Sequence, residues 1–266
     1  MRMRLRLGEQ DLVLNWHQQG LVAGALNRLY GREILTRAHC AESGQPVSPQ
    51  VLFPLLKMQP QRLLELTARQ IQSVMALDSK WRLGGSLWFN LAGELLQDDR
   101  LFGSLLESTL QPLPPAGRQR IVLEVAEDAL DSTLVLERAH TLRRQGFLVA
   151  MDDFGAGYSN LGRLHEDGFD IIKLDLGLIR DVPERIWAAN FYREVVELAA
   201  SSGSLVVAEG IEHQTQSDFV RWAGVDIIQG FLYSRPQPLL NAPNGGLPHP
   251  GSAPRQQEAD APLTCS

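Results

Sequence analysis

Two adjacent aspartates, Asp152 and Asp153, follow an apolar run and precede a glycine-containing turn in the stretch FLVAMDDFGAGYSNL, residues 147–161. The apolar run predicts a buried strand ending near the aspartates, and Gly155 and Gly157 allow a sharp turn beyond it. Two carboxylates about 4 Å apart repel by roughly 1 kcal/mol in water and about 4 kcal/mol near a protein surface. A metal cation would reverse that sign, and a carboxylate bridging two ions suits phosphoester chemistry. The alternative is a helix N-cap and a solvated turn.

Further polar residues of this kind occur along the chain, each in or just after an apolar run, where a lone charge is costly to bury. The whole set is Glu33, Asn90, Glu124, Asp152, Asp153, Lys173, Glu209 and Gln229. It provides five carboxylates, two amides and one ammonium. Oxygen ligands with an open position suit Mg²⁺ or Mn²⁺, and Zn²⁺ is disfavoured because the set contains no His or Cys.

Strand and helix patterns alternate along most of the chain and must position these residues. Runs typical of strands fall at 11–17, within 26–37, and at 86–91, 120–125, 147–151, 169–174, 205–208 and 225–228. Helical patterns fall at 51–77, divided by Pro60, and at 94–110, 133–144, 159–166, 184–200 and 214–223. Residues 20–24 are expected to form a loose turn. Eight strands with helices between most of them predict an α/β fold, a TIM-like (β/α)8 barrel, whose active site forms at the C-terminal ends of the strands.

The amino-acid composition and the net charge argue against several classes of binding partner. The 266 residues are 44% hydrophobic and 21% charged, with a net charge of −6. This charge gives no footprint for nucleic acid, so no DNA partner is expected, and no basic membrane-binding patch either. The sequence contains no run of 18 apolar residues, so no membrane-spanning helix is expected. Two cysteines make no disulfide framework, which fits a reducing cytoplasm.

The expected domain organisation is one barrel followed by a tail. Residues 1–240 are expected to form the barrel. Residues 241–266 are rich in Pro, Gly, Ser and Ala. Such a segment cannot bury enough apolar area to offset its ordering entropy, so it is expected to be disordered.

Several short stretches follow one another along the chain: Glu33-Ile34-Leu35 with Thr36-Arg37, then LEVAE, DDFGAGYSNL, IKLD, AEGIE and QGFLYSRP. In sequence and in order, these motifs resemble those of the EAL-domain family of cyclic-di-GMP phosphodiesterases. The family's Glu-Ala-Leu motif corresponds here to Glu33-Ile34-Leu35, followed by Thr36-Arg37. DDFGAGYSNL resembles the family's DDFGTGYSSL, LEVAE its LExTE, IKLD its IKID, AEGIE its AEGVE, and QGFLYSRP its QGYLFSxP. The resemblance covers about residues 10–238. It implies a TIM-like barrel whose first strand is antiparallel to the others, in agreement with two N-terminal strands joined by a short turn.

The resemblance also implies roles for individual residues. The first metal ion would be bound by Glu33, Asn90, Glu124 and Asp152, and the second by Asp152, Asp153 and Glu209. Lys173 would hydrogen-bond the attacking water and assist its deprotonation, in a catalytic group completed by Glu209 and Gln229. Gln229 and Glu212 would orient water and ligands, and Glu127 would anchor the DDFG loop. Gln18 and Arg37 would contact the dinucleotide, Arg37 through a phosphate.

The chain departs from the family pattern at four positions near these motifs. Ile34 replaces Ala, Ala126 replaces Thr, Gln19 replaces Pro, and Lys57 stands where the family usually has Glu. None of these removes an expected metal ligand or the catalytic lysine. A larger side chain at Ile34 could shift the ligand beside it.

The function implied by the resemblance is hydrolysis of cyclic di-GMP to linear pGpG by two Mg²⁺ or Mn²⁺ ions, in bacterial second-messenger signalling that governs biofilm formation and motility. The alternative is a catalytically weak module that binds cyclic di-GMP or a protein partner. A glycosidase with paired carboxylates needs only two acids and leaves the Asn and Lys unexplained. A homodimer formed through surfaces near the DDFG loop and a protein regulator are also expected.

Overall fold

The computed structural model describes residues 2–81, 83–156 and 169–239. The expected helix at 159–166 and the expected disordered tail at 241–266 lie outside the described residues. The strands are β1 (Arg2–Leu7), β2 (Gln10–Ala23), β3 (Leu29–Cys40), β4 (Pro46–Val47), β5 (Ser86–Asn90), β6 (Ile121–Ala126), β7 (Leu148–Phe154), β8 (Ile171–Leu174), β9 (Leu205–Ala208), β10 (Ile227–Gln229) and β11 (Gln237–Pro238).

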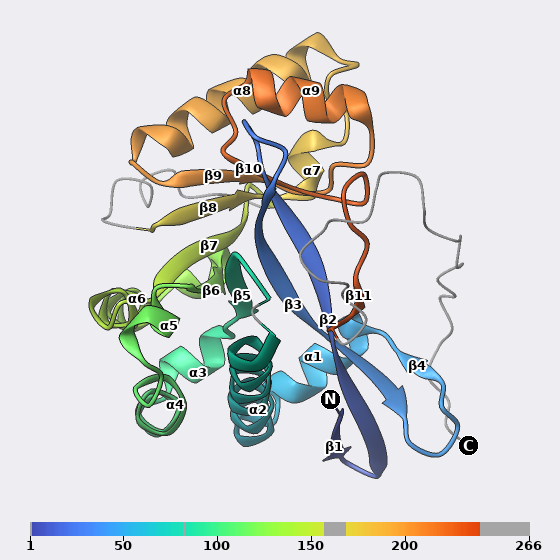
Figure 1. The fold of residues 1–266 in the computed structure, drawn as a ribbon, viewed down its shortest axis with the longest axis vertical. Coiled ribbons are helices and arrows are strands. Elements are labelled where there is room, and N and C mark those ends of the chain that lie inside the picture. The colour runs from blue at the N-terminus through green and yellow to red at the C-terminus, as the bar shows by residue number, and fades with distance from the viewer. Residues whose placement is uncertain (1, 82, 157–168, 240–266) are drawn as a thin grey trace.

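Helices connect most of the strands and pack around the sheet (Figure 1). They are α1 (Pro49–Lys57), α2 (Pro60–Trp81), α3 (Gly93–Gln97), α4 (Asp99–Leu105), α5 (Pro115–Arg118), α6 (Thr133–Arg144), α7 (Leu176–Ile179), α8 (Ile186–Ser201) and α9 (Gln214–Trp222), with a π-helical turn at Leu106–Leu110 and a 3₁₀ turn at Glu127–Asp131. The predicted helix at 94–110 is therefore wrong as a single helix. Asp98 interrupts it, because its side chain caps α4 by accepting from the backbone N–H groups of Arg100 and Leu101.

Eight strands close into a barrel in the order β2-β10-β9-β8-β7-β6-β5-β3, with β3 pairing back to β2. All neighbours from β3 through β5 to β10 are parallel. β2 is antiparallel to both β3 and β10. The predicted TIM-like α/β barrel with an antiparallel first strand is confirmed.

The N-terminal region differs from the sequence prediction in two ways. The expected turn at 20–24 is wrong for residues 20–23, because they continue β2: Gly20 lies opposite Arg32 of β3, and Ala23 opposite Ile227 of β10. The strand β1 was not predicted, although its residues alternate between exposed and buried, as expected for an edge strand covered on one face.

Two hydrophobic clusters hold these elements together. The larger lies between the barrel and its helices. The smaller fills the barrel and consists of Leu21, Trp88, Val122, Ala150, Ile171, Val207 and Ile227, each at most 1% exposed. We call this second cluster the apolar plug. β3 contributes Gly31 at this level, where a Cβ atom would lie only 2.6 Å from Nε1 of Trp88, so the indole occupies that space.

Candidate active site

The predicted polar residues form the layer directly above the apolar plug. Side chains two residues apart on a strand point to the same face. Moving two residues along five parallel strands from Trp88, Val122, Ala150, Ile171 and Val207 gives Asn90, Glu124, Asp152, Lys173 and Glu209. The same step gives Gln229 from Ile227 on β10 and Glu33 from Gly31 on β3. These residues and Asp153 form what we call the acidic layer.

The antiparallel strand β2 contributes to this layer from the opposite direction. Two residues before its plug residue Leu21 stands Gln19, which lies opposite Glu33 and lines a cavity at the site. Gln19 is buried, and its Nε2 donates to the carbonyl of Ser234 at 2.9 Å. In the sequence, Gln19 stands out only as a departure from the family pattern. Reading β2 backwards, because it is antiparallel, would have placed Gln19 beside the acidic layer.

Lys173 forms the electrostatic centre of the layer. Its Nζ lies 2.6 Å from Oε1 of Glu124, 2.8 Å from Oδ1 of Asp152 and 2.6 Å from Oε1 of Glu209. Burial alone would lower the pKa of Lys173, but the carboxylates around it, led by Glu124, raise that pKa well above its ordinary value. Lys173 is therefore a fixed ammonium ion that neutralises part of the surrounding negative charge.

Glu33 is oriented by the two amides of the layer. Asn90 donates through Nδ2 to Oε1 of Glu33 at 3.1 Å, and Gln229 donates through Nε2 to Oε2 at 2.5 Å. Nδ2 of Asn90 is therefore engaged with Glu33, and its Oδ1 remains the atom of this amide that could bind a cation. Oε2 of Glu124 and Oε1 of Gln229 are buried without a hydrogen-bond partner among the described residues.

Asp152, Asp153 and Glu209 form a group that could hold a metal ion. One carboxylate oxygen from each lies within 4.8 Å of the other two. β7 continues through both aspartates to Phe154, so the predicted end of this strand at Met151 came too early. Asp153 has a positive φ of 58°, a left-handed conformation that is uncommon for a residue with a side chain. The strand therefore bends at the point where its two carboxylates turn toward one site.

Three carboxylates of the acidic layer, those of Glu209, Asp153 and Glu124, have pKa values above their ordinary range. Burial raises the pKa of Glu209 to about 8, despite the nearby ammonium of Lys173. Partial desolvation, followed by the charge of Asp152, raises the pKa of Asp153 to about 6. Burial also raises the pKa of Glu124 well above its ordinary range. Five carboxylates share the single ammonium of Lys173, and a bound cation would stabilise their charged forms, so the layer is suited to binding cations.

Glu127 contacts the loop that carries the aspartates. Its Oε2 accepts a hydrogen bond from the backbone N–H of Gly155 at 3.2 Å. The expected contact between Glu127 and this loop is confirmed, but the expected reason is wrong. β6 ends at Ala126, and Glu127 begins a 3₁₀ turn, so the turn rather than strand alternation aims its side chain.

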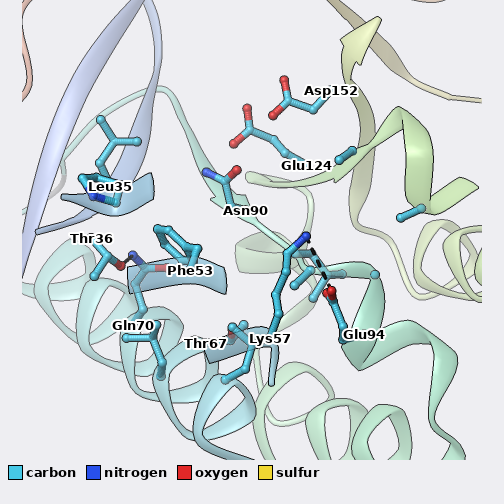
Figure 2. A pocket seen from close by; sticks show the side chains of 18 of the residues that line it. Leu35, Thr36, Phe53, Lys57, Thr67, Gln70, Asn90, Glu94, Glu124 and Asp152 are labelled. Atoms are coloured by element: carbon cyan, nitrogen blue, oxygen red, sulfur yellow. Dashed lines mark hydrogen bonds and ion pairs between the residues drawn. The ribbon is translucent and has the colours of Figure 1, made fainter. Parts of the chain in front are cut away.

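Two cavities meet at the acidic layer, and both are lined by Glu33, Asp152 and Asp153. The first, of about 440 Å³, extends along β3 toward α1 and α2. Figure 2 shows Asn90, Glu124 and Asp152 gathered on one side of it, and Lys57, which pairs with Glu94 at 3.5 Å, rising from another. The second, of about 740 Å³, lies toward α7 and α9. A ligand larger than one nucleotide could therefore occupy both sides of the acidic layer.

Three residues predicted to contact or support the substrate site, Arg37, Glu212 and Gln18, lie in different surroundings. Arg37 lines the first cavity. Glu212 lines the second with an exposed side chain. Gln18 lines neither of these cavities: it is 1% exposed, and its Oε1 accepts from Arg32 at 3.3 Å. The structure thus brings Arg37 and Glu212 to the cavities around the acidic layer and keeps Gln18 beneath the surface.

Two departures from the family pattern have a clear position. Ile34 is 1% exposed and packs in the main core. It points to the face of β3 opposite Glu33, so its extra volume is not directed at the Glu33 side chain. Lys57 forms the ion pair with Glu94 on the wall of the first cavity.

Comparisons with known proteins match this chain to the EAL domain. The family model of the EAL domain matches residues 6–236. The cyclic di-GMP phosphodiesterase PdeR of Escherichia coli is 28% identical over 90% of this chain and 36% of its own length. The cyclic di-GMP phosphodiesterase NbdA of Pseudomonas aeruginosa is 37% identical over 51% of this chain and 18% of its own length. The chain thus spans about a third or less of the length of these curated relatives.

A solved structure supports the same assignment of the fold. The calcium and cy-diGMP complex of Klebsiella pneumoniae BlrP1 is 29% identical, with a TM-score of 0.70, over 89% of this chain and 58% of that one. A manganese and cy-diGMP complex of BlrP1 is 28% identical, with a TM-score of 0.69, over 89% of this chain and 60% of that one.

Proposed function

The chain belongs to the EAL domain family, and we propose that it hydrolyses cyclic di-GMP to linear pGpG in a reaction that requires divalent metal ions. The observation that carries this proposal is the acidic layer. The barrel brings five carboxylates, two amides and one ammonium to one level at the C-terminal ends of its parallel strands. Relatives over this region are named as cyclic di-GMP phosphodiesterases.

The residues of the layer fit two ions, for which we propose Mg²⁺ or Mn²⁺. Glu33, Asn90, Glu124 and Asp152 would hold one ion, and Asp152, Asp153 and Glu209 the other. Oε2 of Glu124, buried without a partner among the described residues, supports the first assignment, and the close approach of the three carboxylates supports the second. Bound divalent ions lower the pKa of a coordinated water and neutralise phosphoryl oxygens.

Side chains of this protein would position the attacking water and the Glu33 carboxylate. Lys173 is held by three carboxylates, which engage all three of its N–H donors. When one of these carboxylates turns to a bound metal ion, the released N–H would donate to the oxygen of the attacking water and fix its direction. Gln229 and Asn90 keep Glu33 in one orientation. In the proposed reaction the water oxygen bonds to phosphorus, the bond from phosphorus to the ribose 3′ oxygen breaks, and that oxygen takes up a proton. The product carries one 5′ phosphate and one free 3′ hydroxyl, as pGpG does.

The test is incubation of the metal-loaded protein with cyclic di-GMP, followed by chromatographic separation of the nucleotides. We expect pGpG to accumulate with either Mg²⁺ or Mn²⁺. Binding of cyclic di-GMP with no conversion over many hours would contradict the proposal and favour the alternative, a binding module without hydrolysis. The Lys173→Ala variant is the matched control, since it removes the ammonium while leaving every proposed metal ligand in place.

We further propose that the protein acts in the cytoplasm as a homodimer, open to control by a protein regulator, in the signalling that governs biofilm formation and motility. The described residues contain no helix long and apolar enough to cross a membrane. Support for dimerisation is an exposed apolar group at the start of α8, where Ile186, Trp187 and Phe191 are at least half exposed. This group follows α7, whose Leu178 packs against Gly155 of the aspartate loop. A single monomeric species in sedimentation at micromolar concentration would contradict the dimer.

A further inference from the structure

The long hairpin of β2 and β3 extends beyond the barrel, where β1 and β4 join it in an open extension of the same sheet (Figure 1). The order of this extension is β1-β2-β3-β4, and every neighbouring pair is antiparallel. One face carries Met3, Leu5 and Leu14, which are buried in the main core together with Leu52 of α1. The other face carries partly or fully exposed residues.

This exposed face continues the inner face of the barrel. On β3, alternation places Glu33 of the acidic layer on the same face as Leu35, Arg37 and His39, in steps of about 6.8 Å. On β2, alternation outward from Gln19 gives His17, Asn15 and Val13. These residues lie opposite Leu35, Arg37 and His39, respectively. A ligand lying on the acidic layer could therefore extend along this face without passing around a strand.

The outer part of this face is positively charged. The strand register places Arg2 opposite Asn15, which lies opposite Arg37. One step further out, Arg4 and His39 lie on the two sides of Val13. We call Arg2, Arg4, Arg37 and His39 the basic sheet face.

Two arginines of the basic sheet face, Arg2 and Arg4, are available to bind anions. Arg2 and Arg4 are exposed and make no ion pair or side-chain hydrogen bond with the rest of the described chain. Arg6, by contrast, lies opposite the acidic residue Asp11 at the far end, and its Nε donates to the carbonyl of Gly8. Burial first, and then the charges of Arg37 and His39, lowers the pKa of His17 on the same face. Cations crowded on one face of a chain with a net charge of −6 would be relieved by a bound anion.

We propose that the basic sheet face binds the phosphate groups of a single-stranded oligonucleotide whose chain runs outward from the acidic layer. The choice of ligand rests on the proposed function, because a polymer of phosphodiesters is the polyanion that could contact both the phosphodiester site and this face. The spacing of about 6.8 Å between alternate side chains is similar to the distance between successive phosphates in an extended strand. A membrane surface fits less well, since Val13 and Leu35 are the only large apolar residues among the described positions of this face.

The overall negative charge does not oppose this inference. Electrostatic attraction between exposed groups decays over a Debye length of about 8 Å at physiological salt, so a polyanion on this face responds mainly to the nearby cations. Binding is expected to be weak and strongly salt-dependent, because only a few phosphates are neutralised.

The test is fluorescence anisotropy of a labelled single-stranded RNA decamer at several salt concentrations between 50 and 200 mM, in excess chelator so that binding is measured without hydrolysis. The variant R2Q/R4Q removes the two unpaired arginines. The control variant R100Q/R144Q removes two exposed arginines on helices away from this sheet, and so changes the net charge equally. A parallel arm replaces the RNA with vesicles containing phosphatidylserine.

We expect the wild type to bind the RNA, and the slope of log K against log salt to fall in magnitude by about 1.4 in R2Q/R4Q, since each contact to a single strand contributes about 0.7. The control variant should keep the wild-type slope. Absence of RNA binding by the wild type, or equal slopes in wild type and R2Q/R4Q, would overturn the proposal. Vesicle binding that R2Q/R4Q abolishes, with RNA binding unchanged, would overturn it in favour of a membrane surface. The readout is independent of cyclic di-GMP hydrolysis, so the two proposals can fail separately.

Discussion

The apolar plug and the acidic layer are neighbouring levels of the same barrel, built by the same strands two residues apart, yet they have opposite effects on the fold. The plug residues are at most 1% exposed, and their one polar side-chain group, the indole N–H of Trp88, donates to Oγ of Ser86. Glu124 and Lys173 are buried almost as completely, at 2% each. Burial of charged groups costs several kcal/mol per ion unless partners compensate. Burial alone therefore does not separate core from site in this barrel, whereas the chemistry of each buried side chain does.

The cost of the acidic layer is only partly offset inside the protein. Lys173 pairs with three carboxylates, and Asn90 and Gln229 satisfy Glu33. Burial raises the pKa values of Glu124, Asp153 and Glu209, so the desolvation of these carboxylates is not fully compensated inside the protein. We therefore expect changes in the plug to affect stability and changes in the layer to affect activity, with little exchange between the two.

The largest expected effect on activity is that of Glu33→Ala. Loss of outer residues that merely support ligands costs 10–100-fold in metal affinity or activity, so loss of a ligand itself should lower hydrolysis at least about 100-fold. The melting temperature of the metal-free protein should stay the same or rise, because one repelling charge is gone. An active Glu33→Ala variant would show that the resemblance at Glu33-Ile34-Leu35 is misleading.

The opposite result is expected from Ile171→Ala in the plug. This side chain is fully buried, and truncation of such a residue costs about 2–5 kcal/mol in the free energy of unfolding. Denaturant unfolding of the metal-free protein measures the loss, and Ile171→Val, at about 0.5–1.5 kcal/mol, is the graded control. Activity per folded molecule should remain close to wild type. A loss of activity equal to that of Glu33→Ala, without a loss of stability, would erase the distinction between the two layers.

A smaller effect is expected from Glu127→Gln, which keeps the shape of the side chain but removes the charge that accepts from the N–H of Gly155. The loop then holds Asp153 less firmly, so binding of the second metal ion should weaken by about 10-fold, and that of the first less. Hydrolysis should fall at low Mg²⁺ and partly recover at high Mg²⁺, with little change in melting temperature. If a metal titration of this variant overlays the wild type, the loop is positioned by other contacts.

A further expected effect concerns stability alone, as a pH dependence in the metal-free protein. Burial raises the pKa of Glu209 from 4.5 to about 8. Between these values the folded protein binds more protons than the unfolded chain, so this group makes stability fall as pH rises from about 4.5 to about 8. Thermal melting in chelator at several pH values measures the fall, and Glu209→Gln should make the profile flatter. A wild-type profile no steeper than that of Glu209→Gln would contradict the assignment.

The contrast between the two layers also explains what could be predicted from the sequence. Glu33, Glu124 and Lys173 were identifiable because a charge at the end of an apolar run is costly and strand ends converge in a barrel. Gln19 was missed because its strand runs in the opposite direction, so that it precedes its plug residue. Strand β1 was missed although its alternation of Arg with Met and Leu is visible in the sequence.

Other features depend on tertiary contacts that carry no local pattern. The left-handed conformation of Asp153 is set by the bend of β7. The ion pair between Lys57 and Glu94 joins two helices that are distant in sequence. The basic sheet face combines Arg2 and Arg37, which only the register of three strands brings together. The net charge of the chain gave no indication of it, because a sum over all residues contains no positions.

We propose that the acidic layer acts through bound divalent ions. A metal titration of hydrolysis is the direct test of this proposal. Protein stripped with chelator is supplied with increasing Mn²⁺ at saturating cyclic di-GMP, and the rate of pGpG formation and the number of ions bound are followed together. We predict no pGpG before metal is added, full activity when about two ions are bound per chain, and support by Mg²⁺ but not by Ca²⁺, whose larger and looser coordination misplaces the water. Full activity in excess chelator would contradict the account.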